Sequence, residues 1–333
     1  MTTWGTVTLA DEPRELLLAF AAYHLRRGAS AVYIYLDRPD RALAAELSTL
    51  PDVYVTQCDE PFWYVHGGRP PIQTRRQDIV ANLAYQAAQV DWLAHIDADE
   101  FVHGEGPFDL LLNAVPADIS CLRLPVRERA WPAGLEPETI FDGVFRAPIP
   151  GKLGLDRHVL RHLSRFTQRG LTGHTRGKTV ARVGARLELS IHSPKHADDL
   201  DFWESTTHDL LHFDGLTPFH WLLKRLRYAA LPHADQKLHT DHYRWNQINK
   251  LREFPTVWEA RRFQRRLTTL GTAAEAQARA LGFVGDAPGF DPAGDLARLM
   301  PEVAADFTVE HFDACLKARD ADLVEALGLE PTE

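Results

Sequence analysis

The feature that most constrains the fold is an alternation of strand-like and helix-like segments over the first hundred residues. Apolar or β-prone runs occupy 4–9, 31–36, 53–57 and 92–96, and helical patterns occupy 14–27, 40–50 and 72–89. Strands that alternate with helices form parallel sheets, because each crossover helix returns the chain to the same end of the sheet. The sequence therefore predicts an α/β fold with a mostly parallel sheet flanked by helices.

Three carboxylates follow the fourth strand closely, at Asp97, Asp99 and Glu100. Like charges this close destabilise the folded chain unless a cation or hydrogen-bond donors compensate them. Oxygen ligands at a strand end suit a hard divalent ion such as Mg²⁺ or Mn²⁺, which could hold a diphosphate. The alternative is an exposed turn with a helix-capping aspartate, but the apolar strand before the acids and Phe101 after them favour a site.

Other acids also follow predicted strands: Asp11 and Glu12 after the first, and Asp37 after the second. The carboxyl ends of parallel strands share the edge where open α/β sheets bind ligands, so these acids should line one rim with Asp97. Each acid alone could be a cap or a solvated turn residue. Because no Gly-x-Gly-x-x-Gly loop follows the first strand, we expect a nucleotide crevice in which a metal, and not backbone amides, holds the phosphates.

The composition is that of a globular protein, with 333 residues, 45% hydrophobic and 25% charged. The net charge of −9 argues against a nucleic-acid-binding protein. Three cysteines without metal-type spacing are typical of a reducing compartment. The N-terminus lacks a signal-peptide pattern, and no apolar stretch approaches the ~20 residues that cross a bilayer. We expect a cytoplasmic protein; the sequence does not indicate its oligomeric state.

Several short motifs occur together in this first part of the chain. They are Asp11-Glu12, Tyr23-His24 followed by Gly28, Asp37 at a strand end, Arg76-Gln77 with Asn82 on a helix, and Ile-Asp-Ala-Asp-Glu-Phe at 96–101. In this order they resemble glycosyltransferases of the GT-A fold, and more narrowly the bacterial family 2-like group related to glycosyltransferase family 92. The resemblance is specific over about residues 4–103 and patchy to about 225, and it departs at Asp11, where the family has Asn.

The resemblance implies a GT-A catalytic domain at 1–218 and a helical C-terminal extension at 219–333. It also implies a metal-dependent, inverting hexosyltransferase, as in polysaccharide biosynthesis, assisted by Mn²⁺ or Mg²⁺. Such an enzyme moves a sugar from a nucleotide-diphosphate donor to a glycan or lipid-linked acceptor. We take a nucleotide sugar of the UDP type as the expected donor.

The same resemblance assigns residues to the nucleotide pocket and to the metal. The pocket would be lined by Asp11, Glu12, Asp37 and Arg76, with Asp97 shared between nucleotide and metal. Asp97 and Asp99 would hold the ion. The alternative is a protein of the same fold that binds a nucleotide or glycan without turnover, against which the intact Asp97 and Asp99 count.

An inverting transferase needs a carboxylate that accepts the proton of the acceptor hydroxyl. A loop predicted at 131–145 carries two candidates for this base, Asp142 and Glu138. For either acid alone, a solvated loop residue is the simpler interpretation.

Residues 173–179 have a glycine-rich, lysine-containing pattern that invites comparison with a P-loop. Three residues, and not four, separate the glycines, and a strand-like run follows, so we reject an ATPase. In the resembling family a lysine precedes a similar strand. Lys178 could therefore face a phosphate, and a surface lysine is the alternative.

His208 and His212 imitate the zinc-protease motif His-Glu-x-x-His, with Asp in place of Glu. An Asp-Gly pair and a proline follow too soon for a third ligand on the same helix, so a zinc hydrolase is a minor alternative. Many GT-A enzymes complete the metal shell with a late histidine, and this resemblance makes His212 the third protein ligand beside Asp97 and Asp99. The alternative is a buried, hydrogen-bonded histidine.

The last third of the chain shows helical patterns without residues that indicate chemistry, at 257–280 and 308–327. The apolar segment 219–231 carries interleaved basic residues. Packing against the catalytic domain is favoured, and peripheral contact with the inner face of the membrane, near a lipid-linked acceptor, is the alternative. Arginines at four-residue spacing from Arg161 to Arg169 form either a solvated face or a patch for an anionic acceptor.

Overall fold

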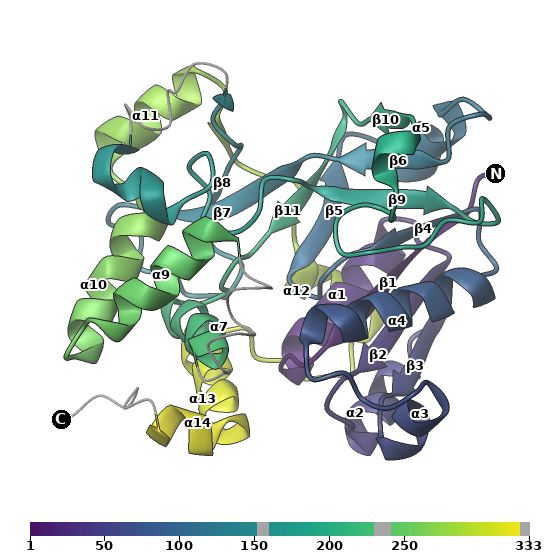
Figure 1. Ribbon diagram of the computed structural model, residues 1–333, viewed down its shortest axis with the longest axis horizontal. Coiled ribbons are helices and arrows are strands. Elements are labelled where there is room, and N and C mark those ends of the chain that lie inside the picture. The colour runs from purple at the N-terminus through teal and green to yellow at the C-terminus, as the bar shows by residue number, and fades with distance from the viewer. Residues whose placement is uncertain (152–159, 230–240, 327–333) are drawn as a thin grey trace. The chain divides into compact units, whose positions relative to one another are not determined.

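The computed structural model describes residues 1–151, 160–229 and 241–326 (Figure 1). Contacts group the chain into two compact units. Unit 1 comprises Met1–Val126, Arg176–Leu211 and Gly289–Ala305, and unit 2 comprises Arg127–Thr175, His212–Pro288 and Asp306–Glu333. Each unit is assembled from separate stretches of chain. The predicted domain division at residue 218 stays a prediction.

The centre of unit 1 is a seven-stranded sheet with the order β10-β6-β9-β4-β1-β2-β3. Its strands are β1 (Trp4–Ala10), β2 (Ala31–Leu36), β3 (Val53–Gln57), β4 (Trp92–His95), β6 (Cys121–Leu124), β9 (Lys178–Arg182) and β10 (Phe202–Glu204). β4, β1, β2 and β3 are parallel neighbours, and β10 is parallel to β6; β9 runs antiparallel to both β4 and β6. The sheet is therefore mostly parallel and, with helices beside it, confirms the predicted fold class (Figure 1).

The parallel strands form where the sequence predicts them, because a sheet covered on both faces needs nearly continuous apolar runs. All seven residues of β1 are buried. β2 and β3 begin and end at the predicted residues. Several strands were not predicted. Among them are β5 (Glu100–Gly104) and β11 (His208–His212), which are neighbours; the last residue of β11 begins a stretch of unit 2.

The helices of unit 1 are α1 (Arg14–Arg26), α2 (Arg41–Leu47), α3 (Glu60–Val65), α4 (Gln73–Ala87), α5 (Phe108–Ala114), α12 (Pro292–Leu299) and the short 3₁₀ turn η3 (Ala197–Asp199). α4 packs on β1 through an apolar cluster that includes Val80, Ala84 and Val7. α1 packs against α12, so a stretch from the end of the chain helps to cover the sheet (Figure 1).

The segment 61–71 after β3 is rich in aromatic residues, glycine and proline, a composition that predicts a loop. Its first part instead belongs to a helix, α3. Asp59 caps this helix by accepting a hydrogen bond from the Phe62 backbone N–H, and Pro61 stands in the first turn, where a proline is tolerated. Trp63 is buried and anchors the helix in the apolar cluster. A cap and one buried tryptophan are enough to fix six residues here.

Unit 2 combines short strands with helices. Its strands are β7 (Val126–Pro132, whose first residue belongs to unit 1), β8 (Val144–Arg146), β12 (Thr269–Leu270) and β13 (Val284–Gly285). Its helices are α7 (Pro218–Ala229), α9 (His242–Arg252), α10 (Val257–Thr268), α11 (Thr272–Ala280), α13 (Val309–Arg319), α14 (Ala321–Ala326) and the 3₁₀ turn η2 (Arg161–Phe166). β8 pairs antiparallel with β7 and β13, and β12 pairs parallel with β7, which splits the predicted helix at 257–280 into α10 and α11.

The helices η2, α7, α9 and α10 share one apolar core in unit 2. α7 covers most of the predicted segment 219–231, of which residues 230 and 231 lie outside the described residues. Phe219, Trp221 and Leu222 on α7 are at most 2% exposed. Because a membrane-bound helix must expose its apolar side chains, this burial favours the packing interpretation.

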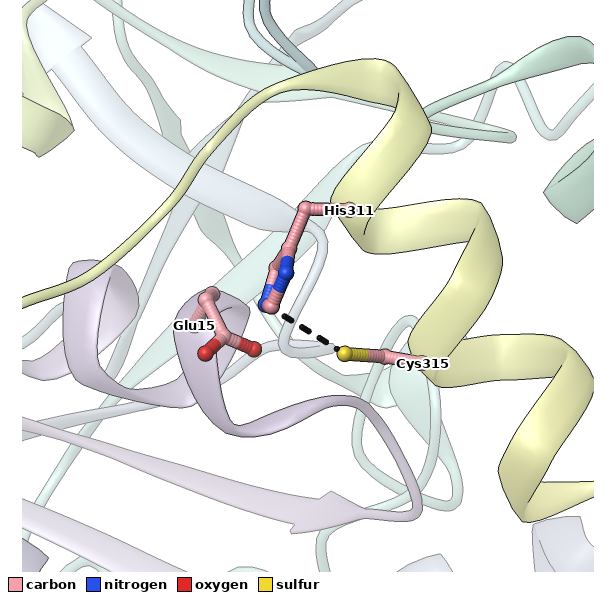
Figure 2. A group of neighbouring side chains, drawn as sticks. All are labelled: Glu15, His311 and Cys315. Atoms are coloured by element: carbon pink, nitrogen blue, oxygen red, sulfur yellow. Dashed lines mark hydrogen bonds between the residues drawn. The ribbon is translucent and has the colours of Figure 1, made fainter.

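The C-terminal helix predicted at 308–327 is divided into α13 and α14, and residue 327 lies outside the described residues. Thr308 caps α13 through its contact with the His311 backbone N–H. Figure 2 shows His311 and Cys315 one turn apart on α13, with the Cys315 Sγ 3.4 Å from His311 Nε2. None of the described helices is long and apolar enough to cross a membrane.

Candidate functional site

The carboxyl ends of β1, β2 and β4 lie at one edge of the unit 1 sheet, as the parallel order requires. Ala10 is in register with Leu36, so Asp11 and Asp37 emerge side by side. The Asp37 backbone N–H donates to the Ala10 carbonyl at 2.9 Å. Asp97 follows β4, the neighbour of β1 on its other side. The predicted acids of these three strands therefore share one edge, which is the usual ligand-binding edge of such sheets.

Asp37 is buried and held by two arginines. Arg76 Nε donates to Oδ1 at 2.9 Å and Nη2 to Oδ2 at 2.7 Å, which is a bidentate pair, and Arg69 Nη2 reaches Oδ1 at 2.9 Å. Arg76 Nη1 also donates to the carbonyls of Pro70 and Pro71. This geometry clamps the loop before α4 to the end of β2. Arg76 is buried in the clamp, whereas Arg69 is 48% exposed and faces solvent.

An open hollow of about 660 Å³ lies beside this clamp, within the usual size range of small-ligand pockets. It is lined by residues that follow β1, β2 and β3 and by α3: Asp11, Asp37, Arg38, Pro39, Cys58, Asp59, Glu60, Trp63, Tyr64, Gly68 and Arg69. Arg38 Nε lies 3.1 Å from Asp11 Oδ1. Glu12 follows Asp11 just before α1 and is half-buried. The hollow therefore combines an aromatic wall with both cationic and acidic side chains.

Asp97 lies in a compact ionic cluster. Lys178 Nζ is 3.0 Å from Asp97 Oδ2 and 3.3 Å from Glu100 Oε2, and Gln77 Nε2 donates to Asp97 Oδ1 at 2.5 Å. The Asp97 backbone N–H donates to Glu100 at 2.9 Å. The Lys178 side chain is fully buried, so the surface-lysine alternative is wrong. Lys178 reaches the cluster because it begins β9, the antiparallel neighbour of β4.

The charges of this cluster shift the pKa values of its members. Burial alone would raise the pKa of Asp97, but the Lys178 ammonium outweighs burial and holds that pKa below its ordinary value. Burial alone would lower the pKa of Lys178, and Asp97 with Glu100 raises it instead. Burial and the Lys178 charge lower the pKa of His95 to about 4, so His95 is neutral at pH 7. The Asp97 carboxylate therefore stays ionised at neutral pH.

Lys178 supplies one positive charge to the two carboxylates of Asp97 and Glu100, and Asp99, which lies between them in the chain, is 4% exposed. The Asp97 side chain is 30% exposed, so a ligand can reach it. Carboxylate oxygens with a residual negative charge fit a hard divalent ion such as Mg²⁺ or Mn²⁺. Asp97 and Asp99 would hold that ion in unit 1.

His212, the predicted third ligand, lies in unit 2 beside His174 and Glu128. Its Nδ1 is 4.0 Å from Glu128 Oε2, and its ring centroid is 4.9 Å from that of His174. Gly173 is required here, because a Cβ at that position would lie 2.5 Å from His212 Cε1. His212 Nδ1 is buried without a hydrogen-bond partner among the described residues, unlike the hydrogen-bonded histidine of the alternative interpretation. A common ion for His212, Asp97 and Asp99 stays a prediction.

Glu128 organises the surroundings of His212. Its carboxylate accepts hydrogen bonds from Arg146 Nη2 at 2.6 Å and from the backbone N–H groups of Thr172 and Gly173 at 2.8 and 2.5 Å. These hydrogen bonds satisfy the fully buried Glu128 carboxylate, which gives it a structural role. It fixes the backbone that presents His174, whose ligand nitrogens lie within 4.8 Å of those of His212.

The two candidate bases occupy the loop between β7 and β8 in different ways. Asp142 accepts hydrogen bonds from the backbone N–H groups of Glu138 and Thr139 at 2.8 and 2.9 Å and from the Thr139 hydroxyl at 3.0 Å. Its carboxylate therefore holds its own turn together. Glu138 is exposed. The role of either acid as the base stays a prediction, and Glu138 is the more accessible of the two.

The zinc hydrolase alternative is wrong. Residues His208–His212 form strand β11, and not the helix that the motif needs. Residues four apart on a strand are separated by roughly 13 Å, so His208 and His212 cannot bind one ion. His208 instead packs on Phe108, and its Nε2 lies 3.3 Å from the Gly106 carbonyl.

Sequence analysis did not assign three residues that the structure brings to the edge of unit 1. Gln77 and Glu100 bind the Asp97 cluster, and Arg69 lines the hollow. Gln77 follows Arg76 on α4, so neighbouring positions of one helix hold the acids after β2 and β4. The position of Gln77 next to Arg76 could have indicated its role from the sequence. For Arg69, in an irregular loop, no local pattern existed.

Comparisons with known proteins give little beyond the geometry. No family model and no curated protein matches the chain. Among solved structures, the chain matches the crystal structure of core-mannan synthase A from Aspergillus fumigatus in its Mn/GDP form. The match has a TM-score of 0.24 and 10% identity, and it covers 37% of this chain and 42% of that one, which is less than half of either.

Proposed function

We propose that the chain is a metal-dependent, inverting glycosyltransferase that binds a nucleotide-diphosphate sugar at the strand edge of unit 1. The observation that carries this proposal is the ionic cluster of Asp97, Glu100 and Lys178 at the same edge as a hollow lined by Asp11 and Asp37. An anionic cluster at a strand edge, with a hollow of nucleotide size at that same edge, supports a diphosphate held through a divalent ion. The nucleotide base and ribose would occupy the hollow.

The roles of the chain's own residues follow from their positions. Asp97 and Asp99 would hold the ion, with His212 as a further ligand, and the ion, when bound, would neutralise the departing diphosphate. Lys178 keeps Asp97 ionised, and Gln77 fixes its orientation. Asp11, Glu12, Asp37 and Arg76 would shape the nucleotide pocket. Glu138, and less readily Asp142, would accept the proton of the acceptor hydroxyl of a glycan or lipid-linked acceptor.

The test is a thermal-shift screen of UDP, GDP, ADP and CDP, each with and without Mn²⁺. We expect one nucleotide to raise the Tm only with Mn²⁺; at about 100 times its Kd the gain corresponds to about 2.7 kcal/mol. Asp99→Asn should abolish this gain, whereas the matched change Asp142→Asn should preserve it. No Mn²⁺-dependent gain with any nucleotide, or the same gain in Asp99→Asn, would overturn the proposal.

A second candidate is a protein that binds the nucleotide without turnover. One observation favours it: both Asp97 oxygens already have a partner, Lys178 and Gln77, which reduces their capacity to coordinate an ion. Release of the free sugar from the donor separates the two candidates. A transferase should hydrolyse its donor slowly in the presence of Mn²⁺, and Glu138→Gln should reduce this hydrolysis by about 10²-fold. Binding without any hydrolysis would select the second candidate.

A further inference from the structure

A second hollow, of about 710 Å³, lies among α7, α10 and α13 within unit 2. Its lining includes five residues of α10: Trp258, Arg261, Arg262, Arg265 and Arg266. Their spacing is i, i+3, i+4, i+7 and i+8, so they occupy a single face of the helix. We call this surface the arginine groove. It was not among the patches that the sequence singled out.

The arginine groove is held in place by the opposite face of α10. Phe263 and Leu267 on that face are buried in the core of unit 2, and the Phe263 ring lies 4.9 Å from that of Phe166. Thr256 caps the helix by accepting a hydrogen bond from the Glu259 backbone N–H. The arginines are therefore presented by a fixed helix, and each of them is exposed.

Positive charge is concentrated here although the whole chain has a net charge of −9. Elsewhere in unit 2 the half-buried Arg279 pairs with Glu275 and Asp286, both at 2.9 Å. In contrast, the salt bridges among described residues include none to Arg262 or Arg265. Arg266 Nη2 hydrogen-bonds to a histidine, at 2.7 Å from His162 Nε2. Arg262 and Arg265 therefore have no carboxylate at salt-bridge distance among the described residues, and the neighbouring guanidinium groups repel one another, so an anion would stabilise the groove.

The groove also offers an exposed aromatic surface. Trp258 is 65% exposed, and the Arg262 guanidinium carbon lies 5.6 Å from its ring centroid. A tryptophan beside arginines suits a ligand that is apolar on one face and anionic at one end. A concave site of this size suits a compact ligand better than the plane of a bilayer. The lining also contains Asp313, whose carboxylate accepts a hydrogen bond from Thr217 at 2.5 Å.

We propose that the arginine groove binds a phosphate-bearing saccharide, with the phosphate on Arg262 and Arg265 and the sugar ring on Trp258. Guanidinium groups bind phosphate oxygens through paired, charge-assisted hydrogen bonds. That this saccharide is the acceptor rests on the proposed function, whereas the binding itself does not.

The test measures binding of glucose 6-phosphate, inorganic phosphate and glucose by isothermal titration calorimetry. We expect glucose 6-phosphate to bind more tightly than phosphate, and glucose not to bind. Arg262→Gln with Arg265→Gln should weaken glucose 6-phosphate binding by about tenfold or more. Trp258→Ala should weaken glucose 6-phosphate but not phosphate. The control, Arg41→Gln, removes an exposed arginine of unit 1 and should leave the affinity within about twofold.

Several results would overturn the inference. If the double variant binds glucose 6-phosphate with unchanged affinity, the two arginines do not bind the phosphate. If phosphate and glucose 6-phosphate bind with equal affinity, the sugar does not contribute to binding. Sedimentation with phosphatidylglycerol vesicles tests the lipid source. Vesicle binding that needs both arginines, with no binding of glucose 6-phosphate, would assign the groove to a membrane surface and contradict the proposal. The exposed positions of the arginines make loss of folding in the variants easy to exclude by their Tm.

Failure of this inference can be distinguished from failure of the proposed function. The arginine variants should keep the Mn²⁺-dependent nucleotide shift, which belongs to unit 1. Asp99→Asn should lose that shift and keep glucose 6-phosphate binding. A nucleotide shift that disappears in the arginine variants would place the nucleotide in the groove and overturn the saccharide assignment.

Discussion

Asp97 in unit 1 and Asp214 in unit 2 are both paired with buried cations, but they differ in exposure. The Asp97 side chain is 30% exposed beside Lys178, whereas that of Asp214 is 4% exposed between Arg225 and Arg244. In both cases the cations outweigh burial, which alone would raise the pKa, and hold the carboxyl pKa below its ordinary value. The difference indicates two uses of the same chemistry: the sealed pair serves folding, and the open pair can accept a ligand.

The largest expected effect comes from breaking the sealed pair. Asp214→Asn would leave the buried Arg225 and the partly buried Arg244 without their carboxylate, and we expect it to lower the free energy of unfolding by about 3–5 kcal/mol. Urea denaturation measures this loss. The control Asp286→Asn breaks an exposed pair with Arg279 and should cost less than about 1 kcal/mol. Similar losses for the two variants would show that burial does not set the difference.

Breaking the open pair should have a smaller effect that a ligand can reverse. Lys178→Met would leave Asp97 and Glu100 without their cation, and we expect a loss of about 3 kcal/mol at pH 7. Protonation of the two acids should relieve this loss, so the free energy of unfolding of the variant should be closer to that of the original chain at pH 4.5. Urea denaturation at pH 7 and at pH 4.5 measures the difference.

The same variant tests access to the cluster. Mn²⁺ should restore part of the stability of Lys178→Met, because an ion can replace the missing ammonium, and should not restore that of Asp214→Asn. The control Lys195→Met removes an exposed lysine that pairs with Glu188. Equal responses of both unstable variants to Mn²⁺ would contradict the distinction between sealed and open pairs.

Within unit 1, the two arginines that contact Asp37 show the same contrast: the buried Arg76 stabilises the fold, and the exposed Arg69 is predicted to bind the ligand. Arg76→Lys should lower stability by about 2 kcal/mol, since the buried bidentate pair is lost. Arg69→Ala should change stability by less than about 0.5 kcal/mol, because Arg69 is half-exposed, yet weaken nucleotide binding by about tenfold. Thermal shift with and without the nucleotide measures both. A loss of stability without a loss of affinity in Arg69→Ala would remove it from the pocket.

The sequence predicted what depends on local pattern. The boundaries of β2 and β3 follow from short apolar runs between turn residues, and the shared edge of Asp11, Asp37 and Asp97 follows from parallel order. α3 was missed because the glycines and prolines of the segment 61–71 outweighed the cap at Asp59 and the burial of Trp63. Propensity is a weak guide where one buried side chain decides the conformation.

What the sequence could not provide depends on residues far apart in the chain. From the sequence, Lys178 could either face a phosphate or lie on the surface. The contact with Asp97, 81 residues away, depends on β9 lying beside β4. His208 and His212 read as a helical metal motif until pairing in a sheet fixes them on a strand. The four arginines of α10 indicated only an amphipathic helix, because the sequence does not show which carboxylates lie near them.

The smallest predicted effect concerns an acid whose partner carries no charge. Asp313 is half-buried with Thr217 as its hydrogen-bond donor, and burial raises its pKa to about 6. The folded state thus holds this proton over a range, roughly pH 4 to 6, in which the unfolded state has lost it, and stability falls as the pH rises through that range.

Asp313→Asn keeps the acceptor oxygen and removes the charge, so it should raise the free energy of unfolding by about 1 kcal/mol at pH 7 and by almost nothing at pH 4. Urea denaturation at both pH values checks this, with Asp322→Asn, an exposed acid on α14, as the matched control that should not respond. Asp214 has cations that outweigh its burial, whereas burial outweighs the effect of Lys317 and Arg261 on the pKa of Asp313. A variant that is less stable than the original chain at pH 7 would mean that Lys317 and Arg261 compensate the Asp313 charge more fully than this.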